Sequence, residues 1–64
     1  MNVKQFSPGD RVKILDGIFK GREARVTSVN QSSDAVRIET TISGKPVPVE
    51  FMSSELGMLE IVED

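Results

Sequence analysis

The sequence predicts an all-β fold in which five short antiparallel strands form a small barrel. Apolar residues recur at every second position in several short runs, which is the spacing of half-buried strands and not of helices. Turn-forming glycine, proline, asparagine, aspartate and serine residues separate these runs. With 64 residues the chain has room for one small core, and closure into a barrel also hides the strand edges.

The alternation gives each element its bounds. We expect strands over residues 11–15, 22–30, 35–42, 47–51 and 58–62. The turns that precede or join them are expected at residues 7–10, 16–21, 31–34 and 43–46. Ser53-Ser54-Glu55 can cap a helix, so we expect at most one helical turn near residues 53–56, ended by Gly57.

Two positions depart from a regular strand. In the second strand the apolar residues stand at 24, 26 and 29, so the period of two fails and predicts a bulge or bend near Thr27-Ser28. Such a bend helps a small sheet to curl into a barrel. Pro48 has no N–H to donate, which predicts an edge strand or a register break at that position.

The inward positions of these strands predict the core, and each matters because a domain this small has a thin stability margin. The candidate core residues are Val12, Ile14, Ala24, Val26, Val29, Val36, Ile38, Val49, Phe51, Leu56 and Ile61, with Phe6 as an anchor from the leader.

The composition excludes several classes of function. The chain has no cysteine and no histidine, which removes disulfides, Cys/His zinc sites and catalysis by either residue. Asp16 and Glu23 are candidate paired carboxylates, but no nucleophile or orienting group accompanies them. We therefore expect no catalytic residue, cofactor or metal. Without a signal peptide or membrane span in the sequence, we expect a single cytoplasmic domain over residues 1–64.

The net charge of −2 hides an uneven distribution. Residues 1–32 carry six basic and three acidic side chains, whereas residues 33–64 carry two basic and seven acidic ones. An acidic chain is a poor general binder of nucleic acid, because affinity depends on neutralising phosphates. A local basic patch around the first loop can still contact RNA or an acidic protein. The alternative is that these charges only solvate the outer faces of the strands.

Two stretches of the chain carry a recognisable motif. The first reads Gly9-Asp10-x-Val12-x-Ile14, then Gly17-x-Phe19-Lys20-Gly21 and Ala24-x-Val26-x-x-Val29, and it is similar to the KOW motif. The second reads Ile42-Ser43-Gly44-Lys45-Pro46-Val47-Pro48-Val49-Glu50-Phe51, and it looks like the second half of the KOW domain of NusG-type transcription factors. The Asp16-Gly17-x-Phe19 loop is typical of NusG proteins and not of ribosomal KOW proteins. The resemblance covers residues 6–62, about the whole chain.

The resemblance implies an SH3-like β-barrel that binds partners and has no catalytic activity. In NusG-type factors an N-terminal domain holds RNA polymerase, and the KOW domain recruits a small-subunit ribosomal protein or the termination factor Rho. We therefore expect a monomeric module, excised from a larger NusG-like protein of transcription elongation, antitermination or termination. The implied surface is formed by loops 16–22 and 42–45, with the partner-binding residues Gly17, Ile18, Phe19, Lys20, Arg22, Ile42, Ser43, Gly44 and Lys45.

The chain departs from the family at three positions. Arg22 and Ser43 stand where NusG proteins usually have aromatic residues, and Ala24 replaces a customary glycine. Because aromatic anchors dominate many interfaces, a specialised paralogue with another partner is an alternative. We expect Phe19, on its glycine-flanked loop, to point outward as an anchor; the other possibility is that it plugs one end of the barrel.

Direct RNA binding, as in ribosomal KOW proteins, is the alternative function. The nucleic-acid site would then consist of Lys20, Arg22, Arg25 and Lys45, which cluster if the two loops adjoin as in the family. RNA binding should weaken steeply with salt, whereas protein binding should depend on Phe19 and tolerate salt.

Overall fold

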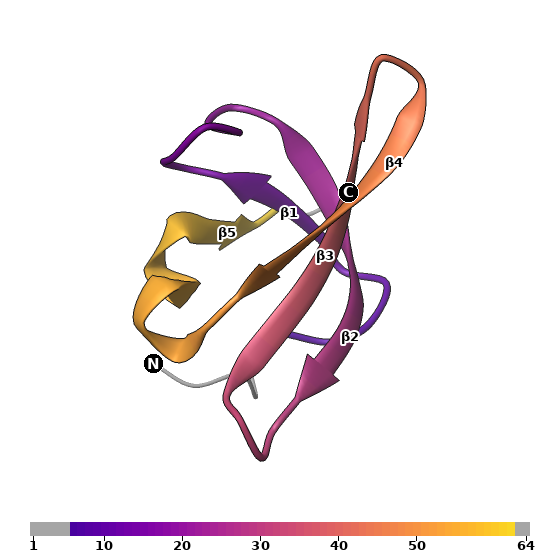
Figure 1. Cartoon of the computed structure of the whole chain (residues 1–64). Coiled ribbons are helices and arrows are strands. Elements are labelled where there is room, and N and C mark those ends of the chain that lie inside the picture. Colours follow the sequence, from indigo (N-terminus) through magenta and orange to yellow (C-terminus); the bar gives the residue numbers. More distant parts are fainter. Residues whose placement is uncertain (1–5, 63–64) are drawn as a thin grey trace.

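The computed structural model describes residues 6–62, so the leader over residues 1–5 and the last two residues lie outside the described part. The chain forms one five-stranded antiparallel sheet in the order β4-β3-β2-β1-β5 (Figure 1). Its strands are β1 (Arg11–Ile14), β2 (Glu23–Asn30), β3 (Ala35–Ile42), β4 (Lys45–Phe51) and β5 (Leu59–Ile61). A 3-10 helix, η2 (Ser53–Met58), joins β4 to β5.

The sheet curls until its two edge strands approach the same short helix. β4 and β5 lie at opposite ends of the strand order, and η2 contacts both of them. In Figure 1 this helix stands beside β5, at the side of the molecule where the curled sheet would otherwise remain open. The predicted all-β, five-stranded, SH3-like barrel is therefore confirmed.

The predicted bulge in β2 is confirmed as well. Val26 pairs with Ile38 of β3 and Ser28 pairs with Arg37, so Thr27 is the extra residue. The Thr27 hydroxyl donates to the carbonyl oxygen of Arg37 at 3.1 Å, which ties the bulged residue to β3. Bulges increase the local twist of a strand, and here that twist helps β2 and β3 to wrap around the core.

The turn between β3 and β4 is shorter than predicted. β4 begins at Lys45, so the turn consists of Ser43 and Gly44 alone and does not extend over 43–46. Both residues have positive φ, 53° for Ser43 and 79° for Gly44, as two-residue hairpins of matching twist require. Pro48 lies on the edge strand, as expected, opposite Glu39 of β3.

The helical segment is longer than predicted. η2 covers six residues and includes Gly57, so a single turn over 53–56 ended by Gly57 was wrong. Met52 is the N-cap residue in place of a serine, and its N–H donates to Glu55 Oε1 at 3.1 Å. Glu55 thus completes the start of the helix, as an acidic residue in the first turn commonly does.

Most of the predicted core is buried. The confirmed residues are Phe6, Val12, Ile14, Ala24, Val26, Val36, Ile38, Phe51 and Leu56. Val29 and Val49 are only half-buried and pack against the core from its rim. Ala35, Leu59 and Thr40 are also buried, and the Thr40 hydroxyl is satisfied because it donates to the Glu23 carbonyl oxygen at 3.0 Å.

The prediction was wrong for Ile61, which is 42% exposed. Ile61 lies opposite Val12 and therefore shares its inward face, while Leu59 lies opposite Ile14. β5 is an edge strand, however, and Ile61 is its last residue, so little of the described chain covers it. Leu59, next to the end of η2, takes the buried position instead.

The difference in burial between Leu56 and Ile61 predicts unequal losses of stability for two truncations of similar size. Leu56→Ala, at a side chain with no exposed surface, should lower the free energy of unfolding by about 2–5 kcal/mol. Ile61→Ala, the matched control, should cost about 1 kcal/mol or less because the side chain is already partly solvated. Urea unfolding followed by circular dichroism measures both. Equal costs would contradict the burial described here.

Candidate functional site

The two loops expected to form the binding surface lie at the same end of the sheet. Ala24, near the start of β2, pairs with Thr40, near the end of β3. The loop before β2 and the turn after β3 therefore leave the same end of the sheet, at the upper left and the upper right in Figure 1. The two loops thus share one end of the sheet, and their joint binding surface stays a prediction.

Backbone hydrogen bonds give the loop between β1 and β2 a defined conformation. Lys20 N–H donates to the Gly17 carbonyl oxygen at 3.2 Å, and Arg22 N–H donates to that of Phe19 at 3.1 Å. Gly21 N–H donates to the carbonyl oxygen of Ile14 at 2.7 Å and closes the base of the loop. Gly17 and Gly21 adopt φ values of 89° and 88°, which residues with a Cβ rarely reach.

The same loop is fixed to the end of η2. Leu15 N–H donates to the carbonyl oxygen of Met58 at 2.7 Å. A Cβ atom on Gly17 would lie 3.2 Å from Met58 Cε, so the methionine side chain packs directly against the glycine. The loop thus rests on a second element from the far end of the chain. The conformation of the β1–β2 loop is therefore held by contacts within the domain itself.

Within this loop the exposed apolar residue is Ile18, not Phe19. Ile18 is 92% exposed, whereas Phe19 is half-buried and packs against the core. The turn from Gly17 to Lys20 has these two residues at its centre, and it directs one side chain outward and the other inward. The expectation that Phe19 points out as an anchor was therefore wrong, and the phenylalanine packs against the core instead.

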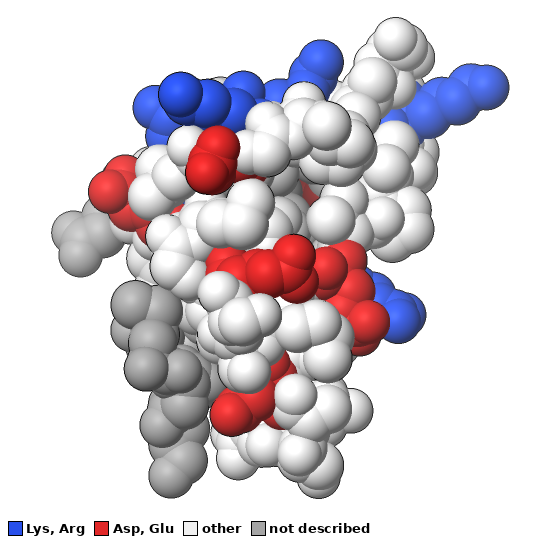
Figure 2. All heavy atoms as spheres, turned by 60° about the vertical axis from the view of Figure 1, so that its left-hand side comes forward, with Lys and Arg blue, Asp and Glu red and all other residues white. Residues whose placement is uncertain are grey.

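Three of the four basic residues expected to cluster lie at this end. Lys20, Arg22 and Lys45 are exposed, and no ion pair within residues 6–62 involves them. Figure 2 shows Lys and Arg side chains gathered along the upper end of the molecule, with most Asp and Glu side chains below. The surface near the two loops is therefore locally positive on a chain of net negative charge.

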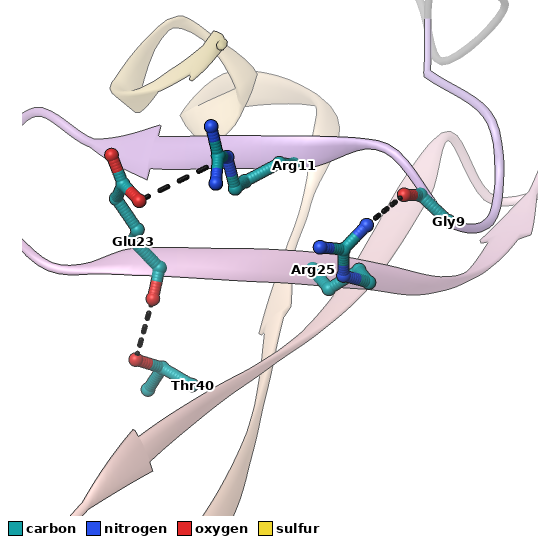
Figure 3. Close-up of polar contacts among 5 residues, drawn as sticks. All are labelled: Gly9, Arg11, Glu23, Arg25 and Thr40. Carbon is teal, nitrogen blue, oxygen red and sulfur yellow. Dashed lines mark hydrogen bonds and ion pairs between the residues drawn. The ribbon is translucent and has the colours of Figure 1, made fainter. Parts of the chain in front are cut away.

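Arg25 does not join this cluster. It pairs across the sheet with Arg11, and the two like charges are turned apart by different partners (Figure 3). The Arg25 guanidinium donates to the Gly9 carbonyl oxygen at 2.8 Å, while Arg11 Nε lies 3.9 Å from Glu23 Oε1. Because cross-strand like charges are destabilising, these contacts have a structural role.

The turn after β3 offers less side-chain surface than expected. Ile42 is half-buried, and Ser43 and Gly44 are exposed but small. Lys45 pairs with Ile42, so their side chains share one face of the hairpin. The hairpin therefore contributes one cation and part of one apolar side chain.

The candidate carboxylates have structural partners. Asp16 Oδ1 accepts a hydrogen bond from Gly17 N–H at 2.8 Å, and Glu23 lies beside Arg11. Over residues 6–62 no group of three or more His, Cys, Asp or Glu side chains is placed to hold a metal ion. In the same part of the chain, no helix has the length and apolar character needed to cross a membrane.

The sequence reasoning missed two apolar residues beside Ile18. Leu15 is 40% exposed and bonds to the backbone of Met58, which is half-buried and packs against Gly17. Leu15 carried a signal, because it follows Arg11 and Lys13 in the outward phase of β1, where a polar residue is expected. Met58 carried none, since its contact with Gly17 joins distant parts of the chain.

Comparison with known proteins agrees with the fold. The family model of the KOW motif matches residues 8–39, which is half of the chain. The chain is 36% identical to the transcription elongation factor Spt5 of Pyrococcus furiosus over 57 residues, covering 89% of this chain and 38% of that protein. It is also 36% identical to the transcription termination/antitermination protein NusG of Xylella fastidiosa over 55 residues, covering 86% of this chain and 28% of that protein.

A solved structure shows the same arrangement in three dimensions. The crystal structure of an MjSpt4:Spt5 complex matches 92% of this chain, and 38% of the chain compared, with a TM-score of 0.72 and 29% identity. The chain belongs to the KOW family, as a KOW domain of the type found in the transcription factors NusG and Spt5. It spans less than two fifths of the length of these relatives.

The contact between Gly17 and Met58 generates a prediction for the loop. Gly17→Ala should lower the free energy of unfolding by roughly 1–2 kcal/mol, because alanine is strained at positive φ and its methyl group displaces Met58. Gly57→Ala is the matched control: Gly57 has no positive φ and open space around it, so alanine there should be neutral or stabilise by about 0.4–1 kcal/mol.

Urea unfolding gives both free energies, and amide chemical shifts report the loop. In Gly17→Ala the shifts of residues 15–22 and 58 should change together. A loop that moves without Met58 would contradict the contact between them.

Proposed function

We propose that this domain is a non-enzymatic protein-interaction module of a NusG-like transcription elongation, antitermination or termination factor. It recruits a small-subunit ribosomal protein or Rho through loops 16–22 and 42–45. RNA polymerase is contacted by another domain of the longer protein, in keeping with the small share of its relatives that this chain spans.

The observation that carries this proposal is the exposure of Ile18. A large aliphatic side chain that is 92% exposed has no role in folding, and it stands on a loop already fixed by hydrogen bonds. A partner that buries it gains apolar contact without the cost of ordering a flexible loop. Ile18 therefore replaces Phe19 as the expected anchor, and Phe19 supports it from below.

Direct RNA binding is the weaker alternative, for two reasons. Single-stranded nucleic acids bind by stacking bases on aromatic side chains, and the only aromatics here are Phe6, Phe19 and Phe51, of which two are buried and one half-buried. Arg25, one of the four cations expected to contact RNA, donates to the Gly9 carbonyl oxygen. The remaining cations fit an acidic protein surface as well as they fit phosphates.

An amide-shift titration tests the proposal. The ¹⁵N-labelled domain is titrated separately with the small-subunit ribosomal protein, with Rho and with a short single-stranded RNA. Shifts confined to residues 15–22, 42–45 and 58 with either protein are the expected result. Shifts with RNA alone, weakening as salt rises, would replace the proposal by direct RNA binding.

A pair of variants identifies the anchor. Ile18→Ser should weaken binding of the protein partner roughly tenfold or more, because an aliphatic contact worth about 1.5 kcal/mol is lost. Met52→Ser is the matched control, since Met52 is 43% exposed at the N-cap of η2, away from both loops, and serine is favoured there. If Ile18→Ser binds like the unmodified domain, Ile18 is not the anchor.

A further inference from the structure

We infer that the surface beside the β1–β2 loop accepts an acidic protein segment in which one bulky aliphatic side chain is flanked by carboxylates. This inference rests on the proposed function and adds to it the chemistry of the partner. The apolar part of the surface is formed by Leu15, Ile18 and Met58, here called the Leu15 patch. The cations Lys20, Arg22 and Lys45 lie at the same end of the barrel.

The three residues of the Leu15 patch are linked through Met58 and Gly17: Leu15 bonds to the Met58 backbone, the Met58 side chain lies against Gly17, and Ile18 follows Gly17 in the chain. The Leu15 N–H donates to the Met58 carbonyl oxygen at 2.7 Å, and Met58 Cε lies within 3.2 Å of the Cβ position of Gly17. Ile18 follows directly. Leu15 and Ile18 are 40% and 92% exposed, and Met58 is half-buried beside them. Methionine adapts its shape easily, so the patch can accommodate a bulky aliphatic side chain.

The Leu15 patch extends the proposed binding surface from the β1–β2 loop toward the end of η2. Leu15 and Met58 belong to neither of the two predicted loops, and Met58 is the last residue of η2. The segment bound here therefore lies across the β1–β2 loop and the η2–β5 junction. The hairpin after β3 contributes the charge of Lys45 and little apolar surface, since Ser43 and Gly44 are small.

The charges select an acidic segment. Lys20, Arg22 and Lys45 form no ion pair within residues 6–62, whereas Arg25 and Arg37 elsewhere on the barrel contact a carbonyl oxygen and Glu50. The nearby carboxylate of Asp16 is occupied by the Gly17 N–H, and that of Glu23 lies 3.9 Å from Arg11. Carboxylates of a partner would thus meet the loop cations without displacing an internal carboxylate.

A set of three peptides tests the inference. The probe is a short synthetic peptide with one leucine between pairs of glutamates. In one companion the leucine is replaced by glycine, and in the other the glutamates are replaced by glutamines. The first peptide should shift the amides of residues 15–22 and 58. Each companion should bind roughly tenfold more weakly, because each lacks one of the two kinds of contact.

Variants of the domain complete the test. Leu15→Ser should weaken binding of the acidic peptide several-fold, whereas Met52→Ser should not. The double change Lys20→Gln and Lys45→Gln should remove the preference for glutamate over glutamine. Lys13→Gln is its matched control, because Lys13 lies between Glu23 and Glu60 across the sheet and away from the loop tips. Unchanged stability in urea confirms that each variant folds.

The outcomes separate this inference from the proposed function. Peptide shifts elsewhere on the barrel, no shifts, or stronger binding of a single-stranded RNA at the same amides would overturn the inference. It would also fail, with the proposed function intact, if the ribosomal protein or Rho bound at Ile18 without any effect of Leu15→Ser or of the lysine changes. Binding of the acidic peptide at the Leu15 patch, without binding of either protein, would support the inference and overturn the named partners.

Discussion

The pairing of β1 on both of its sides is the interaction on which the rest of this small structure depends. β1 has four residues, yet it pairs with β2 and with β5, and its inward side chains Val12 and Ile14 are at most 1% exposed. The Ile14 carbonyl oxygen also accepts the hydrogen bond from Gly21 N–H that closes the β1–β2 loop. Ile14 therefore belongs both to the core, through its side chain, and to the base of the candidate site, through its carbonyl oxygen.

Much of the fold could be predicted because strands with one buried face have a simple period. β3 was predicted to the residue, and the failure of alternation after Val26 located the bulge. Errors arose where the sheet ends. Ile61 has the inward phase of a core residue, but only the strand order reveals that, within residues 6–62, no further strand pairs beyond β5. Likewise, no local pattern shows that β4 begins at Lys45.

For the candidate site, the sequence located the loops but not the directions of their side chains. Ile18 and Phe19 are adjacent on a glycine-flanked turn, and the pattern alone does not decide which one points outward. The tertiary structure decides it, because the Phe19 ring packs against the core while Ile18 remains exposed. Arg25 was grouped with the loop cations because the sequence does not reveal its hydrogen bond to the Gly9 carbonyl oxygen. Met58 is distant from Gly17 in the sequence, so its contact with Gly17 could be found only from the folded structure.

The prolines of β4 have a consequence for how this domain shares space with copies of itself. Pro46 and Pro48 lie opposite Thr41 and Glu39, and the backbone nitrogens of both carry no hydrogen where the outer edge of the sheet is open. An edge without these donors is a poor template for another strand. Such a unit can reach a high local concentration, or be repeated along a polypeptide, without its sheet edges pairing into aggregates.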